Sequence, residues 1–81
     1  MAITFSKHSL QQIKLRKITK NEVLKVLNNP DEILRDKFGN KVAQKIIGNF
    51  LLRVFYLEEK DKITIITAYK TSKLKKYLKN K

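Results

Sequence analysis

The chain has 81 residues, of which 42% are apolar, with 19 Lys and Arg, seven Asp and Glu, one His and no Cys. This length fits one domain, which we place over residues 1–81. The absence of cysteine excludes disulfides and thiolate metal sites, and no apolar run approaches the roughly 18–20 residues that a membrane-spanning helix needs.

Charge is the strongest signal in the composition. A formal net charge of +12 at pH 7 favours a polyanionic partner such as RNA, DNA, the ribosome, an acidic protein or an anionic membrane surface. A lysine-rich surface that serves only solubility is the alternative. The first residues lack the basic-then-apolar layout of a secretion signal, so we expect a cytoplasmic protein with no membrane partner.

The first part of the chain predicts a short strand followed by a helix. Residues 2–5 have a strand-like pattern. Ser6 then offers a hydroxyl that can cap a helix over residues 7–17. Leu10 and Ile13 lie three positions apart and give this helix an apolar stripe.

A second helix is predicted to begin directly afterwards. Thr19 and Glu22 have the spacing of a capping box, in which each side chain accepts from the backbone amide of the other residue. The helix must end before Pro30, because the residue before a proline avoids the helical region. Its apolar stripe consists of Val23, Val26 and Leu27.

The second half of the chain predicts four strands joined by short polar turns. Glycine–asparagine pairs mark the first two turns, and residues 58–61 form a charged third turn. The strands are expected at 32–36, 41–47, 50–58 and 62–70. The last two are richest in β-branched and aromatic residues, so we place them centrally in the sheet. Residues 71–81 can add one or two helical turns, with Leu74, Tyr77 and Leu78 on one face.

Together these elements predict an α+β fold. We expect a short N-terminal strand, two helices packed on a four-stranded antiparallel meander sheet, and a short C-terminal helix. The two apolar stripes are expected to cover one face of the sheet.

The sequence offers little for metal or cofactor chemistry. Most of the seven acidic residues fall in predicted caps and turns, and the two glycines are isolated turn residues rather than parts of a phosphate-binding loop. Zinc sites use His or Cys, and magnesium sites need converging carboxylates. We therefore expect no metal site and no cofactor. Any catalysis would then have to use cationic and aromatic side chains.

Arg53 interrupts the apolar run of residues 50–56. Burying an unpaired charge is costly, so this arginine must be paired, exposed or functional. Strand alternation places it on the same sheet face as Leu51 and Phe55. An arginine exposed to solvent there, or paired with an acid on a neighbouring strand, is the structural alternative.

Three further side chains are candidates for chemistry. His8 is the only histidine and lies near the start of the first helix, so it is either a base or a polar helix residue. Tyr69 and Lys70 end the last strand, where they either contact an anion or serve as a packed ring and a solvated lysine. The sequence alone leaves both alternatives open.

One reaction needs only this set of side chains, namely the cleavage of RNA by its own 2′-OH. A base takes the 2′ proton, cations stabilise the charged phosphorane, and an acid protonates the leaving 5′ oxygen. No metal is required. The predicted catalytic residues are His8, Arg53, Tyr69 and Lys70.

The lysine-rich tail predicts contact with the RNA backbone, with Tyr77 interleaved as a stacking platform. Solvated lysines are the alternative. The predicted RNA-binding residues are Lys45, Lys73, Lys75, Lys76 and Tyr77, and Lys79 and Lys81 extend the basic run.

A family resemblance is carried by three runs: 5-FSKHSLQQIKLRKITKNEVLKVLNNPDEI-33, 46-IIGNFLLRVFY-56 and 66-ITAYKTSKLKKY-77. They resemble a domain-of-unknown-function family of small bacterial and archaeal proteins. This family is similar to the BrnT toxins and, more distantly, to the RelE/ParE toxin superfamily. The S-x-H start, the N-P break and the T-A-Y-K-T-S end carry the resemblance, which covers nearly the whole chain.

The resemblance implies a RelE-like fold with a basic cleft on the sheet face opposite the helices. RelE-type toxins are mostly ribonucleases that act on mRNA in the ribosome or on free RNA, and antitoxins neutralise them. Arg53 matches the basic residue of the penultimate strand, Tyr69 and Lys70 match the end of the last strand, and His8 matches the family histidine. ParE-type relatives instead inhibit DNA gyrase.

We therefore predict a metal-independent endoribonuclease toxin, with RNA and an acidic antitoxin as partners. The alternatives are a non-catalytic basic module that binds RNA, the ribosome or a protein, and a gyrase-inhibiting toxin. The sequence also leaves open whether the protein forms a homodimer. We expect the start of the first helix to open into the same cleft as Arg53 and Tyr69, because a centrally paired N-terminal strand would carry it there.

Overall fold

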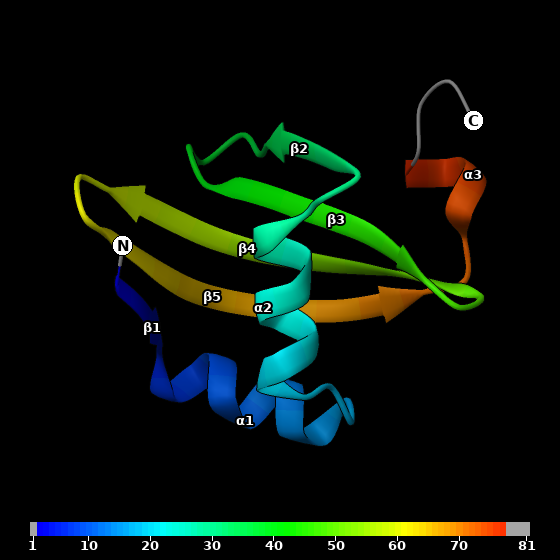
Figure 1. Cartoon of the computed structure of the whole chain (residues 1–81), viewed down its shortest axis with the longest axis horizontal. Coiled ribbons are helices and arrows are strands. Elements are labelled where there is room, and N and C mark those ends of the chain that lie inside the picture. The colour runs from blue at the N-terminus through cyan, green and yellow to red at the C-terminus, as the bar shows by residue number, and fades with distance from the viewer. Residues whose placement is uncertain (1, 78–81) are drawn as a thin grey trace.

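A computed structural model of the chain describes residues 2–77, which form five strands and three helices (Figure 1). The elements are β1 (Ala2–Phe5), α1 (Lys7–Leu15), α2 (Lys20–Asn28), β2 (Glu32–Arg35), β3 (Lys41–Ile47), β4 (Phe50–Glu59), β5 (Lys62–Thr71) and α3 (Leu74–Tyr77). The predicted α+β class is confirmed.

The strands form one mixed sheet in the order β1-β5-β4-β3-β2. Strands β2 to β5 pair antiparallel with their neighbours, whereas β1 pairs parallel with the first half of β5, from Ala2 opposite Lys62 to Phe5 opposite Ile65. The prediction of a four-stranded antiparallel meander is therefore wrong. The N-terminal strand joins the sheet, and it does so at the edge rather than centrally.

Helix α1 starts at the predicted cap. The Ser6 hydroxyl accepts a hydrogen bond of 3.0 Å from the Ser9 amide, which satisfies one of the amide groups that a helix start leaves without a partner. The helix ends at Leu15, two residues before the predicted end. The chain turns there through Lys17, whose φ of 57° lies in the left-handed region, and such a residue cannot continue a right-handed helix.

Helix α2 begins with the predicted capping box. The Thr19 hydroxyl accepts from the Glu22 amide at 3.1 Å, and the Glu22 carboxylate accepts from the Thr19 amide at 2.9 Å. The helix ends at Asn28, before Pro30, as the sequence predicts.

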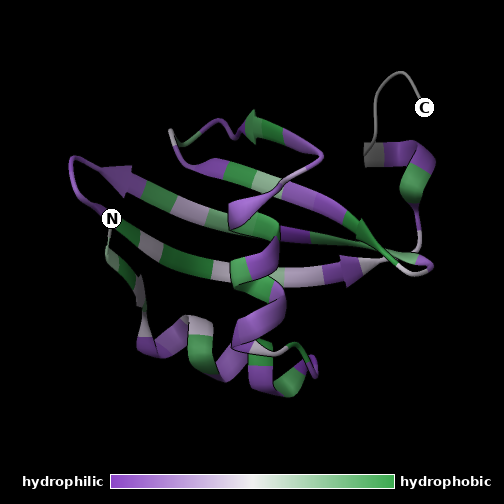
Figure 2. Ribbon diagram, in the orientation of Figure 1, coloured by the Kyte–Doolittle hydropathy of each residue, from purple (hydrophilic) through white to green (hydrophobic). Residues whose placement is uncertain are grey.

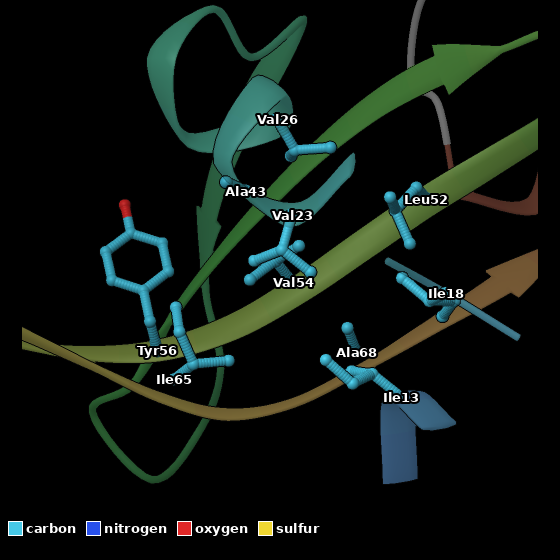
Figure 3. Close-up of a cluster of buried hydrophobic side chains, with 10 residues drawn as sticks. All are labelled: Ile13, Ile18, Val23, Val26, Ala43, Leu52, Val54, Tyr56, Ile65 and Ala68. Atoms are coloured by element: carbon cyan, nitrogen blue, oxygen red, sulfur yellow. The ribbon is translucent and has the colours of Figure 1, made fainter. Parts of the chain in front are cut away.

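The hydrophobic core lies between the two helices and one face of the sheet. Helix α1 contacts β5, and α2 contacts β4 and β3. Figure 3 shows the side chains of both helices meeting those of the strands. The cluster comprises Ile13, Ile18, Val23, Val26, Ala43, Leu52, Val54, Tyr56, Ile65 and Ala68. The predicted helix stripes are confirmed, because Ile13, Val23 and Val26 are buried, and Leu10 and Leu27 pack against the cluster.

Figure 2 shows hydrophilic and hydrophobic residues interspersed along both helices, and hydrophobic residues recurring along β3, β4 and β5. In the part of the chain that the structure describes, none of the helices has the length and apolar character required to span a membrane. We call the sheet face that carries the core the helix side, and the opposite face the far face.

Candidate site on the far face of the sheet

Four polar side chains lie in a row across four strands of the far face. Glu32 on β2 is opposite Gln44 on β3, Gln44 is opposite Arg53 on β4, and Arg53 is opposite Tyr69 on β5. Paired residues of neighbouring strands project from the same face. Because Leu52 and Val54 flank Arg53 and belong to the core on the helix side, the row projects from the far face.

Hydrogen bonds join these four side chains, which we call the far-face network. Arg53 Nη1 donates to the Tyr69 hydroxyl at 2.6 Å, and Arg53 Nε donates to Gln44 Oε1 at 2.9 Å. Gln44 Nε2 in turn donates to Glu32 Oε1 at 2.7 Å. The guanidinium is thereby held from two sides by residues of two other strands.

The polarity of the network is fixed by its two ends. An ionised carboxylate only accepts hydrogen bonds and a guanidinium only donates them. The Gln44 amide must therefore turn its nitrogen to Glu32 and its oxygen to Arg53. Gln44 has no exposed surface, and a buried amide oxygen without a partner costs about 1–3 kcal/mol, so the network also stabilises the fold.

Two aromatic rings lie next to the guanidinium. The Arg53 guanidinium carbon is 5.4 Å from the centroid of Phe55 and 5.7 Å from that of Tyr69. The rings are stacked, with centroids 6.0 Å apart and planes inclined by 22°. Cation–π contacts of this kind contribute about 0.5–2 kcal/mol. All three side chains are partly exposed.

This chemistry suits a phosphate with an attached base. A guanidinium binds phosphate oxygens through its planar fork of donors, and aromatic faces stack with bases of any sequence. The site therefore combines the two kinds of contact that single-stranded nucleic acids use.

The network lies within the segment that matches a known family. Residues 5–70 match the family described as a domain of unknown function, DUF4258. The chain belongs to this family. No curated protein and no solved structure matches the chain. The DUF4258 segment includes the whole far-face network and excludes the lysine-rich tail.

Of the four predicted catalytic residues of this DUF4258 protein, the structure brings together Arg53 and Tyr69. Lys70 follows Tyr69 directly and therefore projects to the other face, where it lies opposite Leu52. Its ammonium is 3.5 Å from a carboxylate oxygen of Glu22. The backbone amide of Thr19 holds the pKa of Glu22 below its ordinary value of 4.5, with Lys70 adding to this effect and burial opposing it. Lys70 thus pairs with a residue at the start of α2 rather than with the far-face network.

His8 is not brought to Arg53. It is exposed in the first turn of α1, and its side chain makes no hydrogen bond, ion pair or ring contact with residues 2–77. The Ser6 amide donates to the Ile65 carbonyl at 3.3 Å, so α1 starts level with Ile65. Tyr69 is four residues further along β5, or about 13 Å. The expectation of a shared cleft is wrong because β1 pairs at the sheet edge.

The predicted RNA-binding residues divide between two places. Lys45 lies on the helix side, where its ammonium donates to the Asn29 carbonyl at 3.0 Å and lies 3.8 Å from the Asp31 carboxylate. Lys73, Lys75 and Lys76 are exposed around the short helix α3. The side chain of Tyr77 and the residues Lys79 and Lys81 lie outside the described part of the chain.

Glu32 and Gln44 are site residues that the sequence patterns did not predict. Gln44 was detectable as a polar residue inside the apolar strand 41–47, the same signal that marked Arg53. Glu32 carried no such signal, because an acidic residue at the start of a predicted strand is expected to be exposed to solvent. Among residues 2–77, the His, Asp and Glu side chains form no group of three or more that could hold a metal ion.

Proposed function

We propose that this DUF4258 protein is a metal-independent endoribonuclease whose active site is the far-face network. The observation that carries the proposal is the Arg53–Tyr69 pair, a fixed guanidinium donating to a hydroxyl beside two stacked rings. Cleavage of RNA by its own 2′-OH needs a cation at the phosphorane and a proton donor at the leaving oxygen. Both groups are present within one hydrogen bond of each other.

The proposed step assigns one role to each group. The 2′ oxygen attacks phosphorus, its proton passes to solvent, and the bond from phosphorus to the 5′ oxygen breaks. Arg53 stabilises the additional negative charge on the phosphorane oxygens. The Tyr69 hydroxyl accepts from Arg53, so its own proton points away from the guanidinium, and it donates this proton to the 5′ oxygen before regaining one from solvent. The products are a 2′,3′-cyclic phosphate and a 5′-hydroxyl.

Phe55 and the ring of Tyr69 are proposed to stack with the bases that flank the cleaved bond. Their faces lie beside the Arg53 guanidinium, so a nucleotide whose phosphate binds Arg53 can lay its base on one of the rings. The net charge of +12 is expected to draw RNA toward the site.

We further propose that the protein is the toxin of a toxin–antitoxin pair. Support comes from the resemblance of three sequence runs to BrnT and, more distantly, RelE-type toxins, and from the positive charge, which suits an acidic antitoxin. Inducing the protein in a bacterial host, with an Arg53→Ala variant as control, tests this assignment. Growth arrest that requires Arg53 is expected, and unimpaired growth at equal expression contradicts it.

Incubation of the purified protein with single-stranded RNA in EDTA, with and without ribosomes, tests the enzymatic proposal. Cleavage to 2′,3′-cyclic phosphate ends is expected from the wild type and not from Arg53→Ala. The matched control is Arg35→Ala, which removes an exposed arginine from β2. Intact RNA under both conditions, or cleavage that survives in Arg53→Ala, contradicts the proposal.

A non-catalytic RNA-binding module is the second candidate. The positions of His8 and Lys70 favour this candidate, because neither side chain lies beside Arg53. Tyr69 is then the remaining proton donor among the predicted catalytic residues. This function predicts salt-dependent RNA binding that requires Arg53 and Phe55 but leaves the RNA intact. The same incubation, followed by a binding titration, distinguishes the two candidates.

A further inference from the structure

We infer that Glu32 is a positioning residue of the far-face site and orients the Arg53 guanidinium through Gln44. Strand β3 lies between Glu32 and Arg53, and the Glu32 carboxylate accepts its hydrogen bond from Gln44 on that strand. Its only route to Arg53 within the far-face network is the Gln44 amide. The consequence for RNA cleavage rests on the proposed function, whereas the orientation of Arg53 does not.

The inference follows from the fixed direction of the network. Glu32 can only accept, so it draws the Gln44 amide nitrogen toward β2 and leaves the amide oxygen facing Arg53 Nε. A neutral amide at position 32 can either donate or accept. Arg53 alone would then set the direction of the Gln44 amide, and Gln44 would bond to a neutral acceptor, which holds it less strongly than a carboxylate does.

Burial makes this dependence strong. Gln44 has no exposed surface, so water cannot replace either partner, and hydrogen bonds are stronger in such surroundings than in water. Glu32 lies on the edge strand β2, with Gln44 between its carboxylate and the cation. The functional site therefore extends over four strands, from β2 to β5, and depends on the β2–β3 hairpin.

Exchanging the two side chains gives a stringent test. In Glu32→Gln only Arg53 still sets the direction of the network, and the charge-assisted hydrogen bond from Gln44 becomes a weaker neutral one. In Gln44→Glu two carboxylates face each other at the place of a 2.7 Å hydrogen bond, and like charges at this distance repel. In the double variant Glu32→Gln/Gln44→Glu, the new amide at 32 donates to the new carboxylate at 44, and this carboxylate accepts from Arg53 Nε.

The primary readout is the side-chain Nε–H resonance of Arg53 in ¹H–¹⁵N NMR, which reports the bond to Gln44 whether or not the protein acts on RNA. We expect solvent exchange of this proton to be about tenfold faster in Glu32→Gln, as for the loss of one charge-assisted hydrogen bond. The double variant should restore slow exchange. Glu59→Gln, which removes an exposed acid at the end of β4, is the matched control and should leave exchange unchanged.

The second readout is RNA cleavage, or RNA binding if the wild type does not cleave. Glu32→Gln should lower the single-turnover rate about tenfold at saturating protein, and the double variant should recover most of it. Wild-type exchange in Glu32→Gln, or a double variant no better than Gln44→Glu alone, overturns the inference. An inactive wild type whose Arg53 exchange still responds as expected contradicts the proposed function and supports the positioning role.

Discussion

The Arg53 guanidinium donates a 2.6 Å hydrogen bond to the Tyr69 hydroxyl across 16 residues of sequence, from the middle strand of the sheet to its neighbour. The strand register places the two residues directly opposite each other. Neither side chain can move without breaking this contact or the aromatic stack beside it. The pair is therefore the fixed centre of the far face.

Removing the Tyr69 hydroxyl separates its two proposed roles. Tyr69→Phe keeps the ring that stacks on Phe55 and removes the proton donor. We expect RNA binding to change by less than about threefold, while single-turnover cleavage falls about 10²–10⁴-fold, as for the loss of a general acid. Equal cleavage rates for variant and wild type would exclude Tyr69 as the acid.

Replacing Arg53 should affect both stability and function. Arg53→Ala removes the hydrogen bond from Arg53 Nε to the buried Gln44 oxygen, so urea denaturation should show a loss of about 1–3 kcal/mol in the free energy of unfolding. Arg53→Lys keeps the charge but not the planar fork, so it cannot reproduce both hydrogen bonds. We expect Arg53→Lys to retain salt-dependent RNA binding and lose most cleavage. Full activity in Arg53→Lys would show that only charge matters.

The two predicted catalytic residues that lie away from Arg53 should be dispensable. His8→Ala and Lys70→Ala leave the far-face network intact, because His8 is exposed on α1 and Lys70 pairs with Glu22 on the helix side. Cleavage rates within about threefold of the wild type are expected, and the lost Lys70 pair should cost at most about 1 kcal/mol. A large loss of cleavage in folded His8→Ala would place catalysis at the start of α1 instead.

The start of α2 should respond to pH. The folded-state pKa of Glu22 is lowered, chiefly by the Thr19 amide and also by Lys70. A lowered pKa contributes stability above the ordinary value of 4.5 and loses it as the pH falls through the folded value. The unfolding free energy of the wild type should therefore exceed that of Glu22→Gln near neutral pH, and the difference should shrink in acid.

Urea denaturation between pH 7 and pH 2 checks the behaviour of Glu22. Lys70→Ala is the matched control, because it removes the Lys70 contribution to the lowered pKa of Glu22 and keeps that of the Thr19 amide. Most of the pH dependence should therefore remain. A difference between wild type and Glu22→Gln that is constant with pH would contradict this account of the capping box.

Local sequence signals predicted the parts of the fold that local physics determines. Ser6, Thr19 and Glu22 form the expected caps because capping depends on spacings of three residues. The alternation of β4 correctly predicted that Arg53 and Phe55 share a face, where the guanidinium lies 5.4 Å from the ring. The apolar stripes of the two helices predicted which helix residues enter the core, because helical periodicity is also a local property.

Long-range pairing explains the errors. Nothing in residues 2–5 specifies a parallel partner 60 residues away, and this pairing fixes where α1 begins. The position of His8 depended on it. Lys70 was grouped with Tyr69 because they are adjacent in sequence, yet adjacent strand residues project to opposite faces. Glu32 and Gln44 could be connected to Arg53 only once the register of β2, β3 and β4 was known.

The central claim is that the far face around Arg53 is where RNA binds. Titrating ¹⁵N-labelled protein with a short single-stranded RNA whose 2′ oxygens are methylated tests it directly, because this RNA keeps its phosphates and bases but cannot be cleaved. We predict that the largest NMR shift changes occur at Gln44, Arg53, Phe55 and Tyr69, including the Arg53 Nε–H. Shift changes confined to α1, α2 and their lysines would contradict the account.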